Sequence, residues 1–124
     1  MNILIDTHIF LWILMAPQKL SQSQRQALES PFNRFYLSSI SVSELMIKES
    51  IGKLSMSFDP IEWAKKSGLE LLSYSAQDAV ALKSLPMLHK DPFDRMLIAQ
   101  AQSQSMTLMS SDGKFPQYGF DIIS

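Results

Sequence analysis

The chain has no cysteine, so disulfides, thiolate metal sites and thiol nucleophiles are excluded. It has only four glycines, and neither a Gly-x-Gly-x-x-Gly, a Walker nor a Gly-x-Ser-x-Gly motif is present. The formal net charge is −1, so any basic groups that contact nucleic acid would have to be local. The apolar run 9–16 is shorter than the roughly 20 residues that a membrane span needs, and no basic region precedes it. We therefore expect a protein with no membrane segment, in a reducing cytoplasm.

The length and composition predict one folded unit. A chain of 124 residues favours a single domain, and we expect that domain to span residues 1–124. Hydrophobic residues make up 46 % of the chain, which is enough for one core and far from a disordered composition.

Short apolar segments alternate with segments of helical periodicity. The predicted strands are 2–5, 35–38, 69–74, 106–110 and 120–123. The predicted helices are 8–15, 22–30, one that starts after Ser41 or Ser43 and runs to about Ile51, 60–66, 76–84 and 93–102. Thr7, Ser21 and Ser75 are the expected N-caps of three of them, and Gly52 and Gly68 are expected terminators. This alternation predicts the α/β class, with a central parallel sheet of about five strands flanked by helices.

Four carboxylates lie just past the ends of predicted strands or in the first turn of a predicted helix. They are Asp6, Glu44, Asp94 and Asp112. Ligands of open α/β sheets collect at the carboxyl ends of the strands, so we expect these acids to meet at one edge. Converging carboxylates repel one another, and a hard cation such as Mg²⁺ is the natural match. The pattern indicates phosphate chemistry and, specifically, cleavage of a nucleic-acid backbone.

Each acid also has an ordinary structural role open to it. Asp6 can cap the helix that follows it. Asp94 and Asp91 can favour a helix dipole from the first turn. Glu44 can pair with Lys48 at i,i+4, and Asp112 before Gly113 is typical of a turn. The set carries more weight than any member, because every predicted location is the same edge of the sheet.

Other polar residues flank the acids in sequence. Lys90, Arg95 and Lys114 are candidate phosphate contacts, with solvated surface charge as the open alternative. His8 and His89 can each serve as a base or a ligand, but neither shows a metal-ligand spacing to another histidine. A partly buried, hydrogen-bonded histidine is the alternative for His8.

Several motifs together resemble a known family. Ile5-Asp-Thr-His8, Ser41-Val-Ser-Glu-Leu45, His89-Lys-Asp-Pro-Phe-Asp-Arg-Met-Leu-Ile-Ala-Gln100 and Ser110-Ser-Asp112 resemble a PIN domain. They are similar, more narrowly, to the VapC-type toxins of bacterial toxin–antitoxin pairs. The resemblance runs over nearly the whole chain in the same order, and the Asp-Pro-Phe-Asp-Arg block is its most specific part.

The resemblance implies a metal-dependent endoribonuclease. By position, Asp6, Glu44, Asp94 and Asp112 match the family's metal-binding acids, while Thr7, Asp91 and Arg95 are possible supporting residues. The implied cofactor is Mg²⁺, with Mn²⁺ as a possible substitute. The implied partners are an RNA substrate, a cognate antitoxin and a second copy in a homodimer.

The sequence allows two other functions, and it offers two candidate apolar surfaces for a protein partner. A degenerate PIN fold could serve as a non-catalytic protein-binding or RNA-binding module. Aspartyl-phosphate transferases also place an acid after the first strand, but they need a second acid where this chain has His8. Candidate surfaces for an antitoxin or a second copy are the segment with Phe10, Trp12 and Ile13 and the stretch 51–58, with core as the alternative for about half of these residues.

Overall fold

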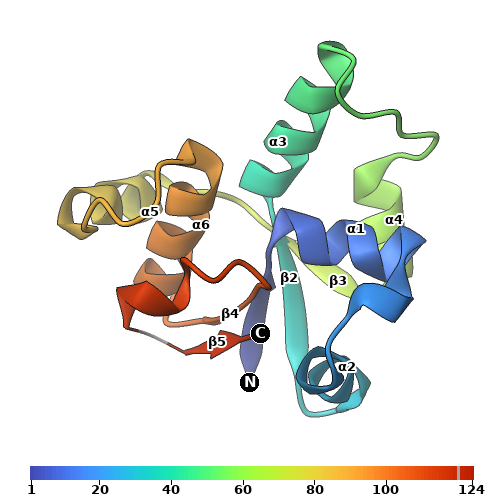
Figure 1. Cartoon of the computed structure of the whole chain (residues 1–124), viewed down its shortest axis with the longest axis horizontal. Coiled ribbons are helices and arrows are strands. Elements are labelled where there is room, and N and C mark those ends of the chain that lie inside the picture. Colours follow the sequence, from blue (N-terminus) through green and yellow to red (C-terminus); the bar gives the residue numbers. More distant parts are fainter. Residues whose placement is uncertain (120) are drawn as a thin grey trace.

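A five-stranded parallel sheet forms the centre of the molecule in the computed structural model, which describes residues 1–119 and 121–124. The strands are β1 (Asn2–Ile5), β2 (Arg34–Ser38), β3 (Leu69–Leu72), β4 (Thr107–Met109) and β5 (Ile122–Ile123). Their order is β3-β2-β1-β4-β5, so the first strand is the central one (Figure 1). Every pair in the sheet is parallel, which confirms the predicted α/β class.

Helices connect the strands and flank the sheet on both sides (Figure 1). The α-helices are α1 (Thr7–Met15), α2 (Gln22–Glu29), α3 (Ser39–Ser50), α4 (Pro60–Lys66), α5 (Ala76–Val80) and α6 (Pro92–Ser103). Three short 3₁₀ helices complete them: η1 (Pro17–Lys19), η2 (Ala81–Ser84) and η3 (Pro116–Tyr118). Each predicted helix is present, with ends that differ by a few residues in several cases.

Alternate residues of β1 face two separate halves of the core, because successive strand side chains point to opposite faces of a sheet. Ile3 and Ile5 pack in one cluster with Phe10 of α1, and Leu4 packs in the other with Leu97 of α6. All five of these side chains are fully buried. A central strand buried on both faces explains why its sequence is a continuous apolar run.

The structure differs from the predicted N-caps at two helices, α1 and α3. The N-cap of α1 is Asp6, and Thr7 is the first helical residue, because the Asp6 carboxylate accepts the Ile9 N–H. The N-cap of α3 is Ser38, the last residue of β2, so the expected caps Ser41 and Ser43 are wrong. The helix begins directly at the strand end, which places Ser41 and Glu44 inside it.

Other expected boundaries are confirmed or shortened. Ser21 and Ser75 both form complete capping boxes, at the starts of α2 and α5. The strand expected to reach Tyr74 ends at Leu72, and the helix expected to reach Ser84 becomes 3₁₀ after Val80. In the last expected strand, 120–123, Ile122 and Ile123 are in β5 and Phe120 lies outside the described residues.

Two glycines end helices as predicted. Gly52 follows α3 with φ +75°, and Gly68 follows α4 with φ +79°. Residues with a Cβ rarely adopt this left-handed conformation, so glycine is favoured just past a helix end.

The apolar segments proposed from sequence as surfaces contain both buried and exposed residues. Phe10 is fully buried, so the core alternative holds for this residue. Trp12 and Ile13 are half-buried against the same cluster, as are Leu54 and Met56 of the stretch 51–58, whereas Ile51 is exposed. Among the described residues, no helix has the length and apolar character to cross a membrane.

Candidate metal centre

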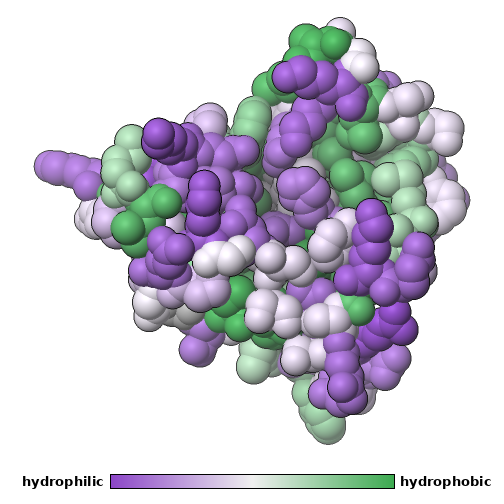
Figure 2. Space-filling view, in the orientation of Figure 1, coloured by the Kyte–Doolittle hydropathy of each residue, from purple (hydrophilic) through white to green (hydrophobic). Residues whose placement is uncertain are grey.

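The carboxyl edge of the sheet brings the predicted acids together. Ile5 of β1 lies in register with Leu37 of β2 and with Met109 of β4, so these three strands end at the same level. Asp6 follows β1 directly, and Asp112 lies three residues after β4. Glu44 comes from α3 and Asp94 from the first turn of α6. Hydrophilic side chains gather in the middle of this face, between α6 and α3 (Figure 2).

Asp6 is held in place by its role as a helix cap. One carboxylate oxygen, Oδ1, accepts the Ile9 N–H at 2.8 Å, and the side chain also bonds to Ser110. The residue is only 4 % exposed. Burial raises the pKa of Asp6 above its usual value, the nearby charge of Asp112 adds to the rise, and the hydrogen bonds offset part of it. The two roles that the sequence left open, helix cap and site acid, therefore coexist.

Glu44 has a partner for each carboxylate oxygen. Thr7 Oγ1 donates to Glu44 Oε1 at 2.8 Å and lies 2.9 Å from Ser41 Oγ. Lys48 Nζ lies 2.7 Å from Glu44 Oε2, which is the i,i+4 pair that the sequence allowed. Glu44 is 2 % exposed, so the hydroxyl and the ammonium provide the compensation that a buried carboxylate needs.

Asp94 is the point at which the acids interact most strongly. Its side chain is 17 % exposed. Burial, followed by the charges of Asp91, Glu44 and Asp6, raises the pKa of Asp94 to about 7, although His89 acts in the opposite direction. Asp91 caps α6 by accepting the N–H groups of Phe93 and Asp94 at 2.9 and 3.2 Å.

Asp112 is a site acid whose hydrogen bonds outweigh its burial. Burial alone would raise its pKa, but hydrogen bonds from the Lys114 N–H and His89, together with the charge of Lys114, bring the pKa below its usual value. Asp112 Oδ1 accepts the Lys114 N–H at 2.9 Å. This turn keeps the carboxylate ionised beside the more protonated Asp94.

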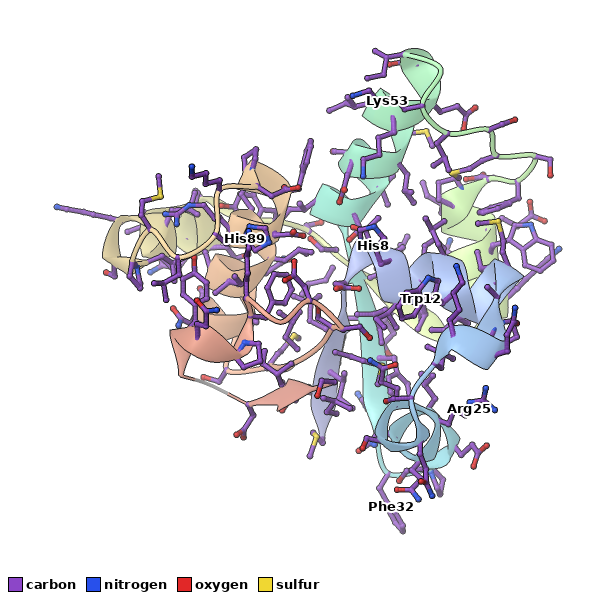
Figure 3. The ribbon with its side chains drawn as sticks, in the orientation of Figure 1. His8, Trp12, Arg25, Phe32, Lys53 and His89 are labelled. Atoms are coloured by element: carbon purple, nitrogen blue, oxygen red, sulfur yellow. The ribbon has the colours of Figure 1, made fainter. Side chains whose placement is uncertain are left out.

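His89, which the sequence offered as a possible base or ligand but which was not among the predicted site residues, lies between two of the acids. Its Nε2 lies 2.9 Å from an oxygen of Asp94 and 2.9 Å from an oxygen of Asp112. Ligand atoms of these three residues all lie within 4.8 Å of one another, so the group has the geometry of a possible metal site. Figure 3 shows His89 on the α6 side and His8 at the start of α1. The available signal was its position in the same block as Asp91 and Asp94.

The expected basic contacts are only partly at the centre. Arg95 Nη1 donates to the Pro86 carbonyl at 3.0 Å, and within residues 1–119 and 121–124 it forms no ion pair with an acid. Lys90 and Lys114 are exposed. A hollow of about 260 Å³ beside the acids is lined by Asp6, His8, Trp12, Ser111 and Asp112.

The donor set fits a divalent cation. Oxygen ligands from several carboxylates are those that Mg²⁺ and Mn²⁺ prefer. The raised pKa of Asp94 reflects burial first and then the negative charge of neighbouring acids, which such an ion would offset. The molecule is thus an open parallel α/β protein with an acidic cluster at the carboxyl edge of its sheet.

Comparison with known proteins agrees with this class. The family model described as PIN domain matches residues 3–121. The chain belongs to the PIN domain family, as the sequence motifs predicted, and this family is generally dependent on divalent metals. No curated protein matches the chain.

Solved structures share the fold at low sequence identity. VapBC2 from Rickettsia felis, bound to a DNA fragment from its promoter, gives a TM-score of 0.75 at 20 % identity, over 98 % of this chain and 97 % of that one. DNA-bound VapBC from Salmonella typhimurium gives 0.67 at 20 % identity, over 98 % and 96 %. FitAcB from Neisseria gonorrhoeae gives 0.64 at 17 % identity, over 98 % and 96 %.

Proposed function

We propose that this chain is a cytoplasmic, divalent-metal-dependent endoribonuclease that acts as the VapC-type toxin of a toxin–antitoxin pair. The observation that carries the proposal is the convergence of charge on Asp94. Its partly buried carboxylate is close enough to Asp91, Glu44 and Asp6 for each to raise its pKa. Natural proteins rarely gather buried acids without a cation or a reaction that needs them.

The residues that would hold Mg²⁺ or Mn²⁺ are Asp6, Glu44, Asp94 and Asp112. When bound, the ion supplies Lewis-acid activation of water and stabilises charge on a phosphodiester. Asp94 is a candidate for direct contact, because the charges of Asp91, Glu44 and Asp6 converge on a side chain that is still 17 % exposed. Glu44 is already bonded by Thr7 and Lys48, which suits contact through water.

The remaining side chains orient the acids. Thr7 fixes one oxygen of Glu44, and Asp91 fixes the first turn of α6 from which Asp94 projects. Lys114 and Lys90 lie exposed next to the acids in sequence, where they can meet a phosphate backbone. Arg95 would have to leave the Pro86 carbonyl to make such a contact.

An antitoxin partner and a homodimer are part of the proposal. Structural neighbours include members of the VapBC family of toxin–antitoxin systems, which supports an antitoxin for this chain. Exposed Met15 and Trp63, which line one hollow together with Phe58, support self-association. Light scattering on the purified protein tests the dimer, and a monomer at micromolar concentration would contradict it.

Cleavage of a mixed RNA substrate with Mg²⁺, with Mn²⁺ and with EDTA tests the activity. Asp6→Asn should abolish cleavage while the protein stays folded, because asparagine caps a helix as well as aspartate does. Asp121→Asn is the matched control, since Asp121 is exposed and outside the cluster.

Each outcome has a clear meaning. Metal-dependent cleavage that is lost only in Asp6→Asn supports the proposal. Full activity of Asp6→Asn in the presence of metal would overturn the assignment of the acids. A folded wild-type protein that neither binds metal nor cuts RNA favours the alternative, a non-catalytic binding module.

A further inference from the structure

One imidazole nitrogen joins two acids that come from different parts of the fold. His89 Nε2 lies 2.9 Å from Asp94 Oδ2, in the first turn of α6, and 2.9 Å from Asp112 Oδ2, in the loop after β4. The His89 side chain is 8 % exposed, so the imidazole itself is shielded from solvent. Two carboxylates this close repel each other unless a donor lies between them.

The other ring nitrogen fixes the position of the proton. His89 Nδ1 accepts the Asp91 N–H at 3.2 Å, and an accepting nitrogen of a neutral imidazole carries no proton. The proton is therefore assigned to Nε2, where it faces Asp94 and Asp112. An Nε2 that carries this proton has no lone pair free for a metal ion.

The surroundings of His89 hold the ring in this orientation. Its backbone N–H donates to the Tyr118 hydroxyl at 3.0 Å. Its ring centroid lies 5.7 Å from the ring centroid of Phe115, and the two ring planes make an angle of 51°. Phe115 is fully buried. Contacts to both ring nitrogens, to the ring face and to the backbone leave the side chain little freedom.

We propose that His89 is a positioning residue that sets the separation of the Asp94 and Asp112 carboxylates through Nε2–H and is not itself a metal ligand. The inference rests on the proposed function, because the acids it positions are the proposed metal-binding acids. Groups that hold ligating side chains through hydrogen bonds typically change metal affinity by about 10-fold to 100-fold when they are removed.

A pair of matched variants separates the hydrogen bond from the bulk of the ring. His89→Gln keeps an N–H donor on a side chain of similar reach, whereas His89→Leu fills space without a donor. In titration calorimetry with Mn²⁺, His89→Leu should bind about 10-fold or more weakly than wild type, and His89→Gln should stay within about threefold. Wild-type affinity in His89→Leu would overturn the proposal, and so would an equal loss in both variants.

Nuclear magnetic resonance of the wild-type protein gives a second test that needs no variant to fold. The chain has two histidines, so long-range ¹H–¹⁵N spectra contain two imidazole systems to assign. The His89 ring should show the Nε2–H tautomer before and after addition of Mg²⁺. An Nδ1–H tautomer, or loss of the Nε2 proton on Mg²⁺ binding, would identify His89 as a ligand and overturn the proposal.

These measurements also distinguish failure of the proposed function from failure of the inference. A wild-type protein that binds neither Mg²⁺ nor Mn²⁺ overturns both. A wild-type protein that binds metal with the same affinity as His89→Leu overturns the role of His89 alone.

Discussion

Asp94→Asn is expected to stabilise the metal-free protein at alkaline pH, even though it should also remove metal binding. The pKa of Asp94 is raised from 3.8 to about 7, first by burial and then by neighbouring acids. At about 1.4 kcal/mol per pH unit, the ionised carboxylate destabilises the fold by at most about 4 kcal/mol above pH 7. Asparagine has nearly the same shape and no charge, so the variant avoids this cost.

The stabilisation by Asp94→Asn should increase as pH rises. Between about pH 4 and pH 7 the folded protein keeps the Asp94 proton that the unfolded chain has released. The stability contributed by this group is therefore fully present below pH 3.8 and is lost as pH rises through about 7. The advantage of Asp94→Asn over wild type should grow by about 3 kcal/mol between pH 5 and pH 8.

Urea unfolding with EDTA present, followed by the fluorescence of Trp12 and Trp63, measures this difference. With a slope of about 1.5 kcal/mol per molar urea, 3 kcal/mol corresponds to about 2 M in the midpoint. Asp121→Asn removes one exposed charge and should show no such pH-dependent gain. If Asp94→Asn loses stability at both pH values, or gains equally at both, the electrostatic account of the cluster is refuted.

Three further predictions follow from the same structure. The affinity of wild type for Mn²⁺, measured by titration calorimetry, should fall about tenfold per pH unit below pH 7, because the ion must displace the Asp94 proton; a flat profile would exclude Asp94 as a ligand. Thr7→Val removes the donor to Glu44 Oε1 while it keeps the side-chain shape. It should lower RNA cleavage and cost about 1–2 kcal/mol in urea unfolding, and unchanged cleavage would separate Glu44 from the site. Leu97→Ala empties a fully buried position of α6 and should cost about 2–5 kcal/mol in the same assay, so a loss below about 1 kcal/mol would contradict the packing described.

Sequence patterns sufficed for the centre of the fold because β1 is a short continuous apolar run that is buried on both faces. Ile3, Leu4 and Ile5 show this directly, since all are fully buried but belong to two different clusters. The convergence of the four acids also followed from sequence, because parallel strands end at a common edge. Helix starts were less predictable, since several adjacent residues can cap a helix: Ser38 serves where Ser41 and Ser43 were expected.

Side-chain pairing at the centre was beyond the sequence. The position of His89 between Asp94 and Asp112 depends on where two loops of different elements meet, and no spacing along the chain encodes that meeting. The bond from Thr7 to Glu44 likewise joins residues 37 positions apart. Arg95 illustrates the reverse case, because its place beside Asp94 in sequence does not aim it at the acids.

The central place of β1 has a consequence for how the chain matures during synthesis. Within this sheet β1 leaves the ribosome before the strands it pairs with, Arg34–Leu37 and Thr107–Met109, and its second neighbour emerges only after about a hundred further residues. Until then one side of β1 has no partner, and Asp6 lacks the backbone bond from its own N–H to Met109. A nascent chain therefore carries an unfinished acidic cluster until residues 107–112 are free to dock. Such long-range pairing is slow to form, and the last segment to arrive determines when the whole cluster exists.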